Sequence, residues 1–235
     1  MCNKQAFQIS RQKDYKGFLI DLILYVSVMF LIRELYIPKI GFIANGLFNS
    51  LTTLAVAMWR MKARGITWRD LGLKAPKNFL KTVGITALIL TTTLVSIIIF
   101  EIVKDQLPFE IAPDTSSESA LSKFGNLKGN WLHFFSIIVF IWIESMLEEL
   151  LDRGFLMNWL ERLFSKTSVA TLLAIVLQAV IFGFRHSYDL SARSISVGII
   201  GLIMGIAYMY LGRNLWPLII AHCILNSLSM IERVL

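Results

Sequence analysis

Cysteine, histidine and long polar stretches are all scarce in this sequence, and each scarcity excludes something. The chain has 235 residues but only two cysteines, Cys2 and Cys223, and Cys223 lies in an apolar run, so a disulfide framework is not expected. No small-residue cleavage site follows the first apolar run, so a cleaved signal peptide is not expected either. No polar segment is long enough for a soluble domain, and the soluble zinc-protease pattern His-Glu-x-x-His is absent.

Hydrophobic residues, by contrast, are abundant. They make up 56% of the chain, whereas a soluble domain is about 45–50% apolar. Several apolar stretches reach about 18–20 residues, the length that a helix needs to cross a bilayer. We therefore expect one integral membrane domain over 1–235, an all-α bundle of about seven or eight transmembrane helices. The expected apolar segments cover 17–35, 41–59, 82–103, a stretch that begins near Asn130 and runs into acidic residues, 169–186, 194–211 and 216–231.

The net charge of +7 is concentrated in particular segments. Lysine and arginine gather in 1–16 and 60–81, as the positive-inside rule expects of cytoplasmic segments, whereas the loop over 104–129 is rich in acids. We therefore expect a multi-pass protein of the cell membrane, surrounded by the lipid bilayer, with a cytoplasmic N-terminal tail. A nucleic-acid partner is not expected, because the basic residues are explained by topology.

The most informative stretch is a run of acids at the end of the fourth apolar segment. Three of these acids lie four residues apart and share one helical face: Glu144, Glu148 and Asp152. A charged side chain at the centre of a membrane helix costs about 2.5–3.5 kcal/mol, so such groups usually mark function. Glu149 precedes Arg153 by four residues, the favourable order for a helical ion pair. We expect this pair to be neutralised and Glu148 to stay free as a general base; the alternative is a purely structural ion-pair network.

Two further polar pairs lie on later helices, while His133 is expected to be structural. Each pair is four residues apart and shares a helical face: Phe182 with His186, and His222 with Asn226. If the turn near Thr167 is the pivot of a helical hairpin, Glu148 lies 19 residues before it and His186 lies 19 residues after it. We therefore expect Glu148 and His186 to reach the same depth and to meet.

These residue types are the ones needed to hydrolyse a carbonyl compound. Glu148 and His186 would hold a water molecule and take its proton. His222 and Asn226 would donate hydrogen bonds to the oxyanion that forms. Glu148, His186 and His222 also match a catalytic zinc set of two histidines and one carboxylate, so zinc stays open as a cofactor and no other cofactor is expected.

The three patterns together resemble the motifs of the CPBP family, the CAAX-processing and bacteriocin-processing intramembrane proteases, also called the Abi family. The resemblance spans about 130–230, and Asp70-Leu-Gly-Leu73 looks like a short upstream family element. The matching residues, in order, are Glu148-Glu149 with Arg153, Phe182 with His186, and His222 with Asn226.

The resemblance implies a bundle of about eight membrane helices that acts as an intramembrane endopeptidase. Its substrate would be a membrane-associated peptide or protein: a lipidated C-terminus, a secreted peptide precursor or another membrane protein. Some relatives act in bacteriocin self-immunity. The family has been described both as metal-dependent and as glutamate-dependent. By likeness, Glu148 would activate water with His186, His222 and Asn226 would stabilise the oxyanion, and the supporting residues would be Glu149, Arg153 and Phe182.

One residue departs from the family pattern, and two other functions stay open. Asp152 precedes Arg153 where relatives commonly carry an aromatic residue, and this extra acid is expected either to compete for His186 or to raise the pKa of Glu148. A non-enzymatic membrane scaffold or immunity protein that binds a partner through the same bundle is the main alternative. A transporter is disfavoured because the chain shows no inverted repeat and no paired broken helices. The sequence predicts no oligomeric state, and it leaves open whether 155–164 forms a separate helix.

Overall fold

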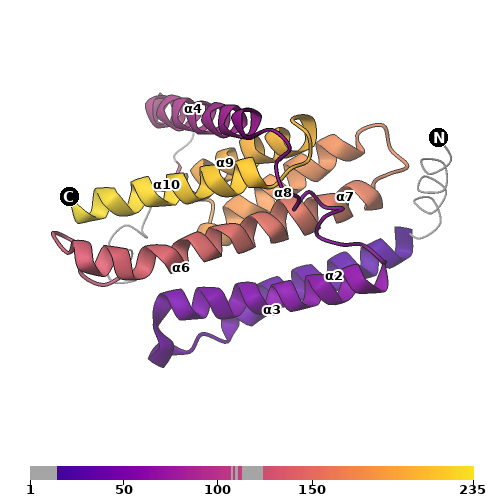
Figure 1. The fold of residues 1–235 in the computed structure, drawn as a ribbon, viewed down its shortest axis with the longest axis horizontal. Coiled ribbons are helices and arrows are strands. Elements are labelled where there is room, and N and C mark those ends of the chain that lie inside the picture. The colour runs from indigo at the N-terminus through magenta and orange to yellow at the C-terminus, as the bar shows by residue number, and fades with distance from the viewer. Residues whose placement is uncertain (1–14, 107, 109–110, 113–123) are drawn as a thin grey trace.

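The computed structural model describes residues 15–235 apart from 107, 109–110 and 113–123 (Figure 1). Every regular element within these residues is a helix. The expected tail over 1–16 and acidic loop over 104–129 fall largely outside the described residues. The helices are α2 (Tyr15–Leu31), α3 (Gly41–Ala63), α4 (Phe79–Val103), α6 (Trp131–Glu149), α7 (Met157–Leu163), α8 (Ala170–Ser187), α9 (Ala192–Tyr210) and α10 (Trp216–Val234), with short 3₁₀ turns at Ile32–Glu34, Pro38–Ile40 and Lys104–Gln106.

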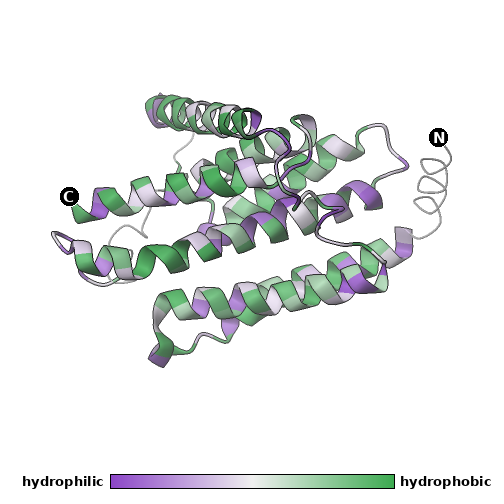
Figure 2. Ribbon diagram, viewed as in Figure 1, coloured by the Kyte–Doolittle hydropathy of each residue, from purple (hydrophilic) through white to green (hydrophobic). Residues whose placement is uncertain are grey.

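Six of these helices are long and apolar enough to cross a membrane. They match six of the seven predicted apolar segments, and the seventh segment is α6, which lies between α3 and α10 (Figure 1). Apolar residues cover the outward faces of the bundle (Figure 2), and Leu80 and Ile102 of α4 are 79% and 62% exposed. Such extensive apolar exposure suits lipid and not water. The expected polytopic helix bundle is confirmed.

The helix that carries the acidic run, the central helix of the bundle, is formed by α6, a π-helical turn and α7. After α6 the chain continues through a π-helical turn (Leu150–Leu156) directly into α7, so residues 155–163 extend this helix and do not form a separate one. A π turn shifts hydrogen bonding from i+4 to i+5, and such turns are frequent at functional sites. Here the side-chain amide of Asn158 donates to the carbonyl oxygens of Arg153 and Gly154, at 3.1 and 2.8 Å, and so compensates for the irregular backbone.

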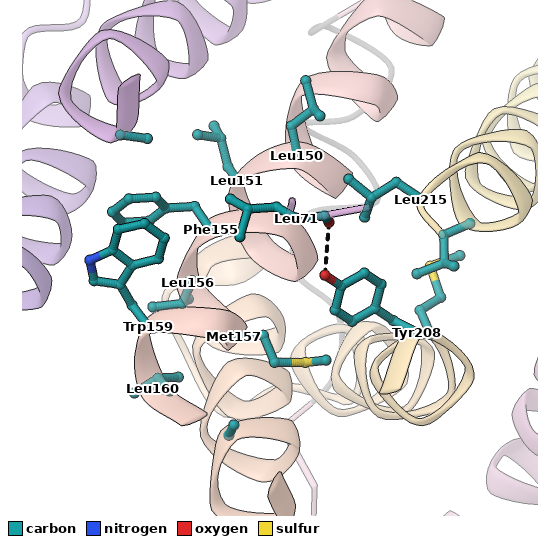
Figure 3. Packing of buried hydrophobic residues seen from close by; sticks show 14 of the residues in the cluster. Leu71, Leu150, Leu151, Phe155, Leu156, Met157, Trp159, Leu160, Tyr208 and Leu215 are labelled. Carbon is teal, nitrogen blue, oxygen red and sulfur yellow. Dashed lines mark hydrogen bonds between the residues drawn. The ribbon is translucent and has the colours of Figure 1, made fainter. Parts of the chain in front are cut away.

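The segment Asp70–Leu73 docks beside this π turn. Leu71 is fully buried, and its carbonyl oxygen accepts a 2.8 Å hydrogen bond from the Tyr208 hydroxyl (Figure 3). The same hydroxyl accepts a 2.8 Å hydrogen bond from Asn158. At the surface of this segment, the hydroxyl and the backbone N–H of Thr67 donate to the Asp70 carboxylate and lower its pKa. The short upstream element thus supports the helix that carries the acidic run.

A second buried network joins α2 to α3 and α7. The carboxylate of Asp21 is fully buried and accepts hydrogen bonds from Nε of Arg60, Nε of Arg64 and Nε1 of Trp159, at 2.7, 2.7 and 3.1 Å. Trp159 in turn stacks on Phe155, with ring centroids 4.0 Å apart (Figure 3). Buried charge needs this many partners because an unpaired carboxylate in an apolar interior is strongly unfavourable.

Helices α8 and α9 approach each other through glycines. A Cβ atom added at Gly183 would lie 2.4 Å from the Ser194 carbonyl oxygen and 2.9 Å from Cα of Gly198. Small residues at such crossings allow membrane helices to pack backbone against backbone. Because Gly183 lies three residues before His186, this close packing also fixes the depth at which the histidine enters the bundle.

We predict that Gly183→Ala destabilises the folded protein by about 1–3 kcal/mol, the usual effect of overpacking. The added methyl group would meet backbone atoms, which cannot move as freely as a side-chain end. Thermal unfolding of the purified protein in detergent measures the effect. Gly84→Ala in α4 is the matched control, because a Cβ there meets nothing within 4 Å. Equal unfolding temperatures for the two variants would contradict the prediction.

Candidate active site

Three helices bring one carboxylate and two imidazoles together. Glu148 lies in the last turn of α6, His186 in the last turn of α8 and His222 in the second turn of α10. Nε2 of His186 is 3.8 Å from Oε1 of Glu148, and Nε2 of His222 is 3.5 Å from Oε2. Each oxygen of the Glu148 carboxylate therefore faces a different histidine, and the expected meeting of Glu148 and His186 occurs.

The hydrogen bonds at the other ring nitrogens orient both imidazoles. Nδ1 of His186 is 2.7 Å from the Phe182 carbonyl oxygen, an atom that only accepts, so this nitrogen carries the proton and Nε2 presents its lone pair. Nδ1 of His222 is 2.8 Å from Oε1 of Glu149, a carboxylate that likewise accepts. Both rings thus turn Nε2 toward Glu148.

The expected ion pair between Glu149 and Arg153 is present and completely buried. Nη1 of Arg153 donates to Oε1 of Glu149 at 2.9 Å, and both side chains are 0% exposed. The same oxygen accepts from His222, so Glu149 connects the arginine to the imidazole. A carboxylate that is paired with a cation in this way can remain charged in an apolar interior.

Phe182 lies at the centre of these groups. Its ring is 4.5 Å from the His186 ring and 6.3 Å from the His222 ring, centroid to centroid. The guanidinium of Arg153 lies over its face at 4.2 Å, a cation–π contact. The spacing of four residues between Phe182 and His186 therefore places a flat apolar surface beneath the two imidazoles.

Asn226 and Glu144 lie on the same helices as the site but contact other groups. The Asn226 amide donates to the Ser145 hydroxyl at 2.9 Å. The Glu144 carboxylate accepts a hydrogen bond from the Ser50 hydroxyl of α3. His133 contacts the Phe124 carbonyl oxygen at 2.7 Å, at the start of α6 and apart from the site, as expected of a structural histidine.

Arg185 belongs to this cluster and was not predicted from the sequence. Its Nη2 lies 2.8 Å from Oδ2 of Asp152 and 3.5 Å from Oε1 of Glu148. The prediction that Asp152 competes for His186 is therefore wrong: the acid is taken by the arginine that precedes the histidine. A signal was available, because an extra acid on the Glu148 face and a basic residue in the apolar helix opposite are expected to compensate each other.

The described residues do not form a ready-made metal site. Among them, no three histidine, cysteine, aspartate or glutamate side chains are grouped so that they would hold a metal ion. The sequence suggested Glu148, His186 and His222 as a zinc set. In the structure each histidine lies close to Glu148, at 3.8 and 3.5 Å.

The sequence model of the family described as "Type II CAAX prenyl endopeptidase Rce1-like" matches residues 130–228. This segment contains all three motifs and all the site residues named so far except Ser50, so it confirms the resemblance to the CPBP family. Over these residues the sequence is similar to Rce1-like members of that family. Comparisons with curated proteins and with solved structures gave no match.

We predict that Arg153→Leu strongly destabilises the protein, by about 3–5 kcal/mol, because it leaves Glu149 as a buried carboxylate without its cation. Arg213→Leu is the matched control. Arg213 also pairs with a glutamate, Glu161 at 2.7 Å, but its side chain is 38% exposed, so its loss should cost about 1 kcal/mol or less. Thermal unfolding in detergent compares the two, and a smaller effect for Arg153→Leu would contradict the prediction.

Proposed function

We propose that this protein cleaves a peptide bond with a water molecule that Glu148 activates. The observation that carries the proposal is the Glu148 carboxylate with an oriented imidazole Nε2 in front of each oxygen. Two polar atoms about 3.8 Å apart, as Glu148 Oε1 and His186 Nε2 are, can share one bridging water. Glu148 is also less buried than Glu149 and Asp152, with 17% of its side chain exposed against 0% for each of those acids.

The proposed reaction has two proton transfers. Glu148 takes a proton from the water molecule while the water oxygen attacks the carbonyl carbon of the peptide bond. This attack gives a tetrahedral intermediate with a negatively charged oxygen. His222 stabilises this oxyanion by donating a hydrogen bond through Nε2, while its Nδ1 contacts the Glu149 carboxylate. Asn226 donates to the same oxyanion through the side-chain amide N–H that does not bond Ser145. The C–N bond then breaks, and Glu148 returns the proton to the leaving amine.

The substrates that we propose first are prenylated C-terminal peptides, in keeping with the description of the matching family. Unmodified peptide precursors, including those of a bacteriocin self-immunity system, are the second class. A non-enzymatic scaffold is disfavoured because such a protein needs neither histidine to be oriented toward Glu148. Zinc dependence is the alternative mechanism, and the experiment below distinguishes it.

The first experiment is a cleavage assay on purified protein in liposomes with labelled prenylated and unmodified peptides. Glu148→Gln keeps the shape of the side chain but removes the base, and His186→Gln removes the second water contact. We expect each to lower kcat at least about 100-fold, the contribution of a positioned general base. Glu101→Gln is the matched control, since Glu101 is half-exposed on α4 and pairs with Lys104.

The outcomes distinguish glutamate–histidine chemistry, zinc chemistry and a non-enzymatic scaffold. Loss of cleavage in the two site variants alone supports the proposal, and unchanged activity with a chelator supports glutamate–histidine chemistry. Loss with chelator that returns on adding Zn²⁺ would establish the metal mechanism instead. A folded wild type that cuts neither peptide class, or cleavage that does not depend on Glu148, would contradict the proposed reaction and favour the scaffold.

The same proposal includes an orientation, with the N-terminus in the cytoplasm. It is supported by the basic residues of the turn between α3 and α4, which the positive-inside rule assigns to the cytoplasm. The test introduces single cysteines at two exposed residues, Lys77 just before α4 and Lys128 just before α6, after Cys2 and Cys223 have been replaced by serine. An impermeant thiol reagent should label Lys128→Cys in intact cells and Lys77→Cys only after permeabilisation. The reverse pattern would overturn the orientation.

A further inference from the structure

The proposed reaction leaves one pair of buried charges unused. Asp152 is completely buried, Arg185 is 14% exposed, and the two are 2.8 Å apart. Asp152 lies one turn after Glu148 on the central helix, and Arg185 directly precedes His186 on α8. Because burying such a pair is costly, its position at the site requires a reason.

A single nitrogen of Arg185 faces both carboxylates. Nη2 is at hydrogen-bonding distance from Asp152, but at 3.5 Å it is too far from Glu148 for a good hydrogen bond. Its other terminal nitrogen, Nη1, lies 3.4 Å from the sulfur of Met29 on α2. The planar fork of an arginine ordinarily binds one carboxylate through two parallel hydrogen bonds. Here the fork is divided between Asp152 and α2, and Glu148 receives only its charge.

We propose that Asp152 and Arg185 are a positioning pair for Glu148. Arg185 balances the negative charge of Glu148 in an apolar surrounding, while Asp152 holds the guanidinium back so that it does not close onto the Glu148 carboxylate. The oxygen that Arg185 would otherwise occupy, Oε1, is the one that faces His186. The pair thus keeps the base charged and accessible at the same time. This inference rests on the proposed function of the same site.

Among the groups around Glu148, Arg185 is the one placed to balance its negative charge. The charged and titratable groups around it come from three helices and the π turn: Glu144 and Glu149 of α6, Asp152 and Arg153 of the π turn, Arg185 and His186 of α8, and His222 of α10. Of the two arginines, Arg153 is already bonded to Glu149. Tyr25 of α2 donates its hydroxyl to the Leu151 carbonyl oxygen at 3.2 Å and so is engaged as well.

The decisive test compares Asp152→Asn with the double variant Asp152→Asn/Arg185→Gln. In the single variant Arg185 is released and should close onto Glu148, so kcat should fall about 10- to 100-fold with KM within about twofold, as for a small misplacement of a catalytic group. Removing the guanidinium as well should restore part of this loss. Arg185→Lys, which keeps the charge without the fork, should retain more activity than Arg185→Gln.

A second readout does not require cleavage. Dicyclohexylcarbodiimide modifies carboxyl groups in apolar surroundings, and mass spectrometry of the peptide that contains Glu148 gives the rate. A guanidinium closed onto Glu148 should protect it, so labelling should slow in Asp152→Asn and recover in the double variant. The labelling rate tests the positioning pair even if the wild type cleaves no peptide. Absence of cleavage would contradict only the proposed function.

The matched control pair is Glu161 with Arg213, a two-point ion pair at 2.7 and 2.8 Å that joins α7 to the turn after α9. Glu161→Gln, alone and with Arg213→Gln, should leave kcat and Glu148 labelling unchanged. If Asp152→Asn keeps full kcat and labelling, or if the double variant is less active than the single one, the pair only holds the helices together and the proposal is overturned.

Discussion

The structure depends on one constraint, which is that a charge inside an apolar bundle must have a partner. Four acids lie within nine residues of the central helix, and each has a defined polar contact. Glu149 is matched by Arg153, Asp152 by Arg185, and Glu144 by the Ser50 hydroxyl. Only Glu148 is left with no direct hydrogen bond of its own and faces two imidazoles. The arrangement of α3, α8 and α10 around the central helix follows from these pairings, because each of the three brings one partner.

The π turn explains how one helix can present so many charges to different neighbours. It begins directly after Glu149 and includes Asp152, Arg153 and Gly154. The irregular backbone is stabilised from outside the helix, by the chain of hydrogen bonds from Asn158 to Tyr208 and on to Leu71. The short segment Asp70–Leu73 is therefore not an ordinary loop. It supports the backbone geometry on which the ion pairs depend, although it lies about 75 residues before them in the sequence.

Much of this arrangement could be predicted from the sequence, because the relevant signals are local. Apolar run lengths give the helices to within a few residues, and spacings of four residues give the pairs Glu149 with Arg153 and Phe182 with His186. The meeting of Glu148 and His186 follows from counting along a hairpin. Contacts between helices that are not the two arms of a hairpin could not be predicted by counting residues in this way. The docking of Leu71 and the contact of Asn226 with Ser145 depend on how helices are rotated and offset, and a single sequence does not encode these locally.

The two arginines of the site illustrate a division between binding a carboxylate and only balancing it. Arg153 is bonded to Glu149 and stacked on Phe182, so its charge is fixed and it binds an oxygen of the carboxylate directly. Arg185 is kept at a distance from Glu148 by its stronger contact with Asp152. The proposed role of Glu148 as a base among apolar neighbours requires the second arrangement, because a direct two-point ion pair would both lower its basicity and exclude water. The extra acid at position 152 thus has a physical role that its departure from the family pattern did not suggest. It converts a potential inhibitor of Glu148, the neighbouring guanidinium, into a counter-charge.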